Sequence, residues 1–227
     1  IDGSGLFRLT YGNSYLGIPT WSPDGSKIAF ALLEHDNWDI YTIYADGRGQ
    51  DNLTYDATIE HDPAWSPDGR LIAFASDRDG NHDIYAMNSD GSGIPTRLTQ
   101  TGAMDHNITW SPDSRQIAYI SRWDGNSSIY VMNADGSGQF RLTNTDVSTH
   151  WPAWSPDGQQ IAFASYQDRI SDIYVINIDG SGLTRLTYSG GSYPTWSPDG
   201  RLIAFASERD GNWDIYLINA DGSNEIR

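Results

Sequence analysis

The stretch WSPDGRLIAFASDRDGNHDIY, residues 65–85, decides the fold of this chain. Its opening Ser-Pro-Asp-Gly is a turn, because proline presets φ at the second turn position, aspartate caps the backbone and glycine accepts a positive φ. Two short apolar runs follow, Leu71–Ala75 and Asp83–Met87, and a polar turn separates them. Short apolar runs bounded by turn residues predict two β-strands joined as an antiparallel hairpin.

The WSPD tetrapeptide occurs five times among the 227 residues, at steps of 44, 45, 44 and 42 residues. Each copy continues through the same two apolar runs, an Asp-Gly turn and a run similar to Arg-Leu-Thr, so that one unit contains four short strands. Units of about 40–45 residues with four strands are typical of propeller blades. The copies begin at the tryptophans Trp21, Trp65, Trp110, Trp154 and Trp196.

We therefore predict a single all-β domain over residues 1–227, a five-bladed β-propeller with four antiparallel strands in each blade. Asp2–Arg8 repeats Asp221–Arg227 at an offset of 219 residues. We expect the N-terminal strand, residues 6–10, to complete the last blade, since an unpaired sheet edge is a liability. The alternative is a slice of a longer array. The predicted blades span residues 17–54, 61–99, 106–143, 150–187, and 192–227 with strand 6–10.

The composition excludes several classes of function. A net charge of -16 opposes binding to nucleic acid and to anionic membrane surfaces, and favours cations and basic partners. The absence of cysteine excludes disulfides and thiolate chemistry. No apolar run is long enough for membrane insertion. The chain begins with Ile1, so we expect a mature or excised form whose targeting segment is missing.

The repeated segments WSPDG, IAFAS, DGNHDIY and RLT resemble the WD40-like repeats of TolB-type β-propellers, and the resemblance covers nearly the whole chain. It implies a propeller fold, a protein partner and a periplasmic or extracellular location. TolB itself has six blades, an N-terminal domain and a peptidoglycan-associated lipoprotein as its partner. The repeat is also similar to the gating propellers of prolyl-oligopeptidase-type enzymes. The copies are so alike that recent duplication or consensus engineering is expected.

Strands of alternating direction sort the loops onto two faces, and we expect function on the face whose loops vary. The four tryptophans outside the motif and all five histidines fall in these variable loops, among many carboxylates. Such exposed aromatic groups suit recognition of a protein, peptide or sugar. The alternative is that they pack as lids over the core. The predicted ligand-binding residues are Trp38, Glu60, His61, Asp62, Asp105, His106, Trp123, His150, Trp151, Tyr193 and Trp213.

A metal site is the most specific chemical hypothesis that the sequence offers. His61, His106 and His150 each stand four residues before a motif tryptophan, so three imidazoles could converge near the mouth of the channel. Imidazole favours zinc, copper, nickel or iron. The other two copies have Ser192 and Gly17 at this position, and the alternative is a loop that merely tolerates polar residues.

Two acidic segments, Asp77–Asp83 and Glu208–Asp214, superficially resemble calcium loops but lack the length and the terminal glutamate of an EF-hand. We predict that they are hairpin turns, with strands starting at Asp83 and Asp214.

No segment predicts a helix, which the strand–turn–helix elbow of a serine hydrolase requires. We therefore expect a non-catalytic, monomeric recognition module that binds a protein or peptide and needs no cofactor, although a divalent cation could occupy the channel. Three alternatives stay open: a carbohydrate-binding propeller, a cation-binding or metal-dependent enzyme, and a designed scaffold without a natural ligand.

Overall fold

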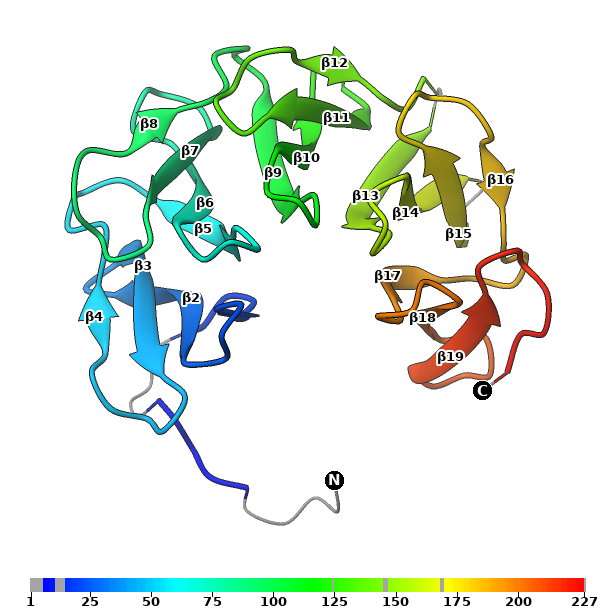
Figure 1. Ribbon diagram of the computed structural model, residues 1–227, viewed down its shortest axis with the longest axis horizontal. Coiled ribbons are helices and arrows are strands. Elements are labelled where there is room, and N and C mark those ends of the chain that lie inside the picture. Colours follow the sequence, from blue (N-terminus) through cyan, green and yellow to red (C-terminus); the bar gives the residue numbers. More distant parts are fainter. Residues whose placement is uncertain (1–5, 11–14, 124, 145–146, 168–169, 227) are drawn as a thin grey trace. The chain divides into compact units, whose positions relative to one another are not determined.

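The computed structural model describes residues 6–10, 15–123, 125–144, 147–167 and 170–226, and all regular structure in these ranges is β-strand (Figure 1). The chain forms two compact units, Ile1–Arg97 and Leu98–Arg227. The first unit contains two antiparallel sheets and the second contains three. Within the described ranges, no helix has the length and apolar character that crossing a membrane demands.

Both sheets of the first unit have their four strands in chain order, as hairpin connections require. The first sheet consists of β1 (Thr20–Trp21), β2 (Lys27–Glu34), β3 (Asn37–Tyr44) and β4 (Asp51–Asn52). The second sheet consists of β5 (Glu60–Trp65), β6 (Leu71–Ser76), β7 (Asp83–Asn88) and β8 (Thr96–Arg97).

The second unit repeats the same order of strands. Its third sheet consists of β9 (Met104–Trp110), β10 (Gln116–Arg122), β11 (Ser127–Asn133) and β12 (Phe140–Arg141). The fourth sheet consists of β13 (Ser148–Trp154), β14 (Gln160–Gln167), β15 (Ile170–Asn177) and β16 (Thr184–Arg185). The fifth sheet has three named strands, β17 (Ser192–Trp196), β18 (Leu202–Ser207) and β19 (Asp214–Asn219).

The apolar runs form the core, as predicted. Phe163 of β14 pairs with Tyr174 of β15, with ring centroids 5.8 Å apart, and an equivalent cross-strand ring pair recurs in every sheet. Neighbouring sheets of one unit bury these strands against each other. In the second unit the motif tryptophan also joins sheets: Trp196 Nε1 donates to the carbonyl oxygen of Ala153 at 3.1 Å. Trp196 therefore has an architectural role in the second unit.

The WSPDG turn owes its repetition to a closed set of local hydrogen bonds. Ser66 Oγ donates to Asp68 Oδ1 at 2.6 Å, and Oδ1 accepts the backbone N–H of Arg70 at 3.1 Å. The serine-to-aspartate bond recurs in all five turns. In the third turn Ser114 stands at the glycine position with φ 62°, so the geometry is kept with a residue for which it is strained.

A buried ion pair fastens the outer strand of the fourth sheet. Asp172 of β15 is almost fully buried and accepts hydrogen bonds from Arg185 Nη2 at 2.6 Å, Thr187 Oγ1 at 3.0 Å and the N–H of Gly190 at 3.1 Å. The third sheet has Ser128 at the equivalent position. The Arg-Leu-Thr run is therefore repeated because it supplies the cation and the hydroxyl of this contact.

The expected completion of the fifth sheet by residues 6–10 stays a prediction, because these residues belong to the first unit and the fifth sheet belongs to the second. Residues 6–10 carry no assigned strand, and Leu6 is almost fully exposed. Leu9 packs against the core of the first sheet. Within the second unit, Ile226 pairs with Leu217 of β19 through two backbone hydrogen bonds of 2.7 and 2.8 Å.

The prediction of two hairpin turns in the acidic segments is confirmed. The N–H of Gly80 donates to the carbonyl oxygen of Asp77, and that of Gly211 to the carbonyl oxygen of Glu208, at 2.8 and 2.9 Å. Strand β7 begins at Asp83, and β19 begins at the equivalent aspartate, as expected.

Candidate functional site

The first strands of four sheets contain a β-bulge three residues before the motif tryptophan. The residue at the bulge has a left-handed backbone, which is uncommon for bulky side chains and costs about 1–2 kcal/mol. Strain of this kind tends to occur where a side chain must be aimed at a functional site. The four bulge residues and their φ angles are Asp62 (54°), Asn107 (52°), Trp151 (52°) and Tyr193 (56°).

The bulges of the fourth and fifth sheets bring two aromatic rings together. The rings of Trp151 and Tyr193 have centroids 4.0 Å apart, and His150 lies 5.5 Å from the Trp151 ring. Trp151 is half-buried, while Tyr193 is exposed. Three of the predicted ligand-binding residues therefore form one aromatic cluster.

This cluster borders a pocket of about 540 Å³ between the fourth and fifth sheets. Its size lies within the usual range for small-ligand and peptide side-chain sites. Apolar surface predominates in its lining, and two of the rings, those of Tyr166 and Trp213, are more than half exposed. The apolar groups of the wall are Trp151, Tyr166, Ile170 and Trp213.

Three polar groups of the pocket, Arg209, His150 and Ser171, have defined surroundings. Arg209 is held by Ser207 Oγ at 3.0 Å, the carbonyl oxygen of Gly190 at 2.6 Å and the carboxylate of Glu225. Burial lowers the pKa of His150, so its imidazole is neutral near pH 7. Ser171 Oγ is buried and has no hydrogen-bond partner among the described residues, which leaves a polar group for a ligand.

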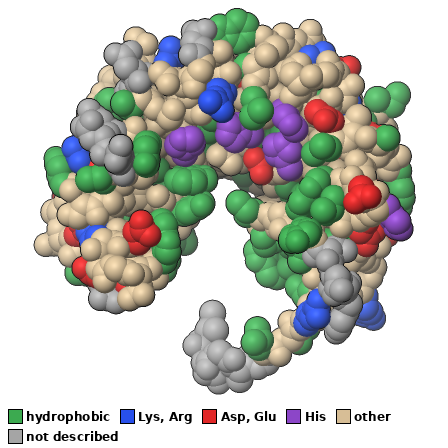
Figure 2. Space-filling view, turned by 180° about the vertical axis from the view of Figure 1, so that it is seen from behind, with side chains coloured by type: hydrophobic (Ala, Val, Ile, Leu, Met, Phe, Trp, Pro, Cys, Tyr) green, Lys and Arg blue, Asp and Glu red, His purple; other side chains and the backbone are tan. Residues whose placement is uncertain are grey.

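The remaining predicted residues of the second unit lie on the third sheet. Asp105 is fully buried on β9, and His106 beside it is half-buried. Trp123 follows β10 and is 57% exposed. None of these three residues lines the pocket. Figure 2 shows histidine side chains at the surface, next to apolar side chains.

Two of the predicted residues of the first unit have different surroundings from those expected. Trp38 lies within β3 and packs against the core shared by the first two sheets, as the alternative hypothesis of a core lid had it. His61 lies within β5, not in a loop, and its Nε2 is 3.1 Å from Nδ1 of His82. Asp62 Oδ2 is 3.5 Å from the other ring nitrogen of His61.

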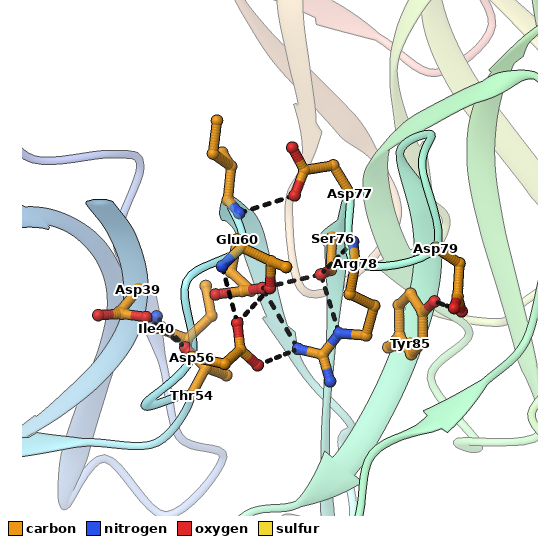
Figure 3. A network of polar contacts seen from close by, with 12 residues as sticks. Asp39, Ile40, Thr54, Asp56, Glu60, Ser76, Asp77, Arg78, Asp79 and Tyr85 are labelled. Carbon is orange, nitrogen blue, oxygen red and sulfur yellow. Dashed lines mark hydrogen bonds and ion pairs between the residues drawn. The ribbon is translucent and has the colours of Figure 1, made fainter. Parts of the chain in front are cut away.

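Glu60 is the fully buried centre of a polar network in the first unit (Figure 3). Its Oε1 accepts hydrogen bonds from Ser76 Oγ at 2.8 Å and Arg78 Nη2 at 3.3 Å, and Arg78 also pairs with Asp56 at 3.3 Å. Its Oε2 is buried and has no hydrogen-bond partner among the described residues. Burial raises the pKa of Glu60 to about 7, although the Thr58 and Ser76 hydroxyls oppose the shift. Glu60 is a proton-binding group of the interior and is not exposed to a ligand.

The metal hypothesis for three histidines stays a prediction. His61 belongs to the first unit, whereas His106 and His150 belong to the second. In the part of the chain that the structure describes, no group of three or more His, Asp or Glu side chains is placed to hold a metal ion.

Sequence reasoning did not identify several pocket residues, among them Tyr166, Ile170, Ser171 and Arg209. A usable signal was present. Proline follows three of the bulge residues, and proline inside a strand marks a bulge or an edge. The prolines would have indicated that the preceding side chains are specially aimed, although they could not have identified the pocket walls.

Comparison with known proteins agrees with this architecture. The chain belongs to the TolB beta propeller domain family, which it matches over residues 9–150 and 107–227. It is 28% identical to a putative TolB from Agrobacterium tumefaciens, with a TM-score of 0.80 over 95% of this chain and 80% of that one. No curated protein matches the chain.

Two further solved structures share the fold at lower identity. TolB from Acinetobacter baumannii is 22% identical with a TM-score of 0.71, and the match covers 92% of this chain and 51% of that protein. The chain thus spans about half of that TolB. An oligogalacturonate lyase from Vibrio parahaemolyticus is 14% identical with a TM-score of 0.61, over 96% of this chain and 80% of that enzyme. The fold therefore occurs both in TolB proteins and in enzymes.

Proposed function

We propose that this chain is a five-bladed propeller in which each sheet is one blade, and that it acts as a non-catalytic recognition module for a protein or peptide. The observation that carries the proposal is the aromatic pocket between the fourth and fifth sheets. The TolB relatives support a binding role, since propellers of this family generally interact with proteins.

The pocket favours an apolar or aromatic side chain of a peptide. Trp151, Tyr166 and Trp213 offer ring faces and edges, which supply large contact areas with little loss of conformational entropy. Ser171 Oγ can pair with a backbone group of the same peptide. The exposed Glu208 at the pocket and the net charge of -16 favour basic residues beside the anchoring side chain.

The test is selection of peptides from a random library displayed on phage, followed by affinity measurements with the purified chain. Trp213→Ala should weaken the selected peptides about ten-fold or more, because exposed aromatic anchors dominate binding energy. Trp123→Ala is the matched control, since Trp123 is 57% exposed and Trp213 is 59% exposed, but Trp123 lies outside the pocket. Equal binding by both variants, or no enriched peptides, would overturn the proposal.

A carbohydrate ligand is the second candidate, favoured by the exposed ring of Trp213 beside hydrogen-bonding groups such as Glu208. A glycan array separates the two candidates. Binding of a sugar that Trp213→Ala abolishes, without any selected peptide, would establish the carbohydrate alternative.

A further inference from the structure

The pocket between the fourth and fifth sheets has a filled counterpart in the first unit, because the repeats align residue by residue. Counted from the motif tryptophan, Ser171 occupies the position of Trp38, and Gly191 occupies that of Glu60. Trp38 packs against the core shared by the first two sheets, and Glu60 is fully buried. The second unit thus lines its pocket with a serine and a glycine where the first unit has a large ring and a carboxylate.

Gly191 cannot carry the missing side chain itself. A Cβ atom at this position would lie 2.7 Å from Cγ1 of Ile173, which is closer than packed carbon atoms approach each other. The N–H of Gly191 donates to the carbonyl oxygen of Ser171 at 2.5 Å, and this contact holds its backbone against the fourth sheet. A carboxylate at this place therefore has to come from a ligand.

A serine and an arginine of the pocket keep the geometry that holds Glu60 in the first unit. Arg209 Nε donates to Ser207 Oγ at 3.0 Å. Arg78 Nε donates to Ser76 Oγ at the same 3.0 Å in the network of Figure 3. Both guanidinium groups also lie 5.4 Å from the phenylalanine ring of their own sheet. The fifth sheet therefore presents the same pair of donors as the second sheet.

The hydroxyl groups of the pocket lack an acceptor. Ser76 Oγ donates to Glu60 at 2.8 Å. The equivalent Ser207 is 2% exposed and accepts from Arg209, but its own proton has no acceptor among the described residues. Ser171 Oγ is also buried and has no hydrogen-bond partner in the described part of the chain. Buried polar groups are costly unless they are paired, so the two hydroxyls favour a ligand with an oxygen acceptor.

The charge of the arginine favours the same kind of ligand. Arg78 pairs with two carboxylates, each at 3.3 Å. Among the described residues Arg209 pairs with one carboxylate, that of Glu225. A guanidinium carries five N–H groups, and the hydrogen bonds of Arg209 use three of them. A ligand carboxylate would give Arg209 the second charged partner that Arg78 has.

We propose that the pocket binds a ligand that combines an aromatic ring with a carboxylate, as a peptide does when its last residue is aromatic. The ring takes the place of Trp38, and the carboxylate takes the place of Glu60 on Ser207 and Arg209. Glu208 at the pocket is exposed, so that water and salt screen its repulsion of the carboxylate. This assignment rests on the proposed function and names the groups that the pocket recognises.

The test is fluorescence anisotropy with three labelled peptides that share one short sequence. The first ends in tryptophan with a free carboxylate, the second ends in tryptophan amide, and the third has a glutamate amide after the tryptophan. The first or the third should bind the wild type about ten-fold tighter than the second, because the amide loses a charge-assisted contact with arginine. Tighter binding of the first alone identifies a C-terminal carboxylate, and tighter binding of the third alone identifies an acidic side chain.

Three variants connect this preference to the pocket. Arg209→Gln should abolish the preference for a carboxylate. Arg78→Gln is the matched control and should keep the preference, since it removes the equivalent arginine outside the pocket. Ser171→Trp introduces the residue that the first unit has at this position. It should weaken the tightest peptide about ten-fold or more, because the new indole occupies the place of the ligand ring.

The comparison of the three peptides uses the wild type, so it remains decisive if a variant fails to fold. Equal binding of the three peptides, with Trp213→Ala still weakening each of them, would overturn the carboxylate and leave the peptide-binding function in place. A preference that persists in Arg209→Gln would also overturn the proposal. Failure of all three peptides to bind would overturn it as well, while the phage selection decides the peptide-binding function separately.

Discussion

Replacing Glu60 by glutamine should remove a large part of the pH dependence of stability. Glu60 is fully buried in the network of Figure 3, and its Oε2 lacks a hydrogen-bond partner among the described residues. Its pKa is raised from 4.5 to about 7 in the folded chain. Glutamine keeps the shape and a carbonyl oxygen for Ser76 and Arg78, but it cannot ionise.

The direction in which the free energy of unfolding changes with pH follows from proton linkage. Between pH 4.5 and 7 the unfolded chain has released the Glu60 proton, whereas the folded chain still holds it. The free energy of unfolding therefore falls as the pH rises, by about 1.4 kcal/mol per pH unit. The stabilisation is fully present below pH 4.5 and is lost as the pH rises through 7, which amounts to about 3 kcal/mol.

The assay is urea unfolding followed by tryptophan fluorescence at pH 5, 6, 7 and 8. The wild type should lose about 2.5 kcal/mol more than Glu60→Gln across this range, because part of the total loss already occurs below pH 5. Glu208→Gln is the control, because Glu208 is exposed, and its pH profile should follow that of the wild type. Parallel profiles for the wild type and Glu60→Gln would refute the reasoning.

Two further predictions concern the repeated contacts. Ser114→Gly should raise the free energy of unfolding by about 1 kcal/mol, because it relieves a φ of 62° at a turn whose other copies have glycine. The reverse change in the second turn, Gly69→Ser, should lower the free energy of unfolding by a similar amount. An unchanged urea midpoint in both variants would contradict this prediction. Asp172→Ala should lower it by about 3 kcal/mol, since Arg185 and Thr187 lose a buried partner. Asp172→Ser should lower the free energy of unfolding by less than Asp172→Ala, because Ser128 accepts the equivalent arginine contact in the third sheet. Equal losses of stability for the alanine and serine variants would contradict this explanation.

The repeat could be predicted from the sequence because its determinants are local. Ser66, Asp68 and Gly69 close their turn with hydrogen bonds between residues only two to five positions apart. The apolar runs pair through adjacent hairpins, so the strand starts at Asp83 and Asp214 were also predictable.

The candidate site depended on contacts that the sequence does not encode locally. The sequence selected both Trp38 and Trp151 because they are tryptophans outside the repeated motif. Trp38 nevertheless packs against the core, whereas Trp151 lines the pocket. The sequence likewise selected His61 but not His82, which lies 21 positions away.

The sequence by itself thus determined the repeat, its turns and its strands, because each depends on neighbours within one hairpin. Only the tertiary structure decided which of those residues meet. The bulges that turn Trp151 and Tyr193 toward each other, and the packing of the fourth sheet on the fifth, depend on side chains from separate repeats.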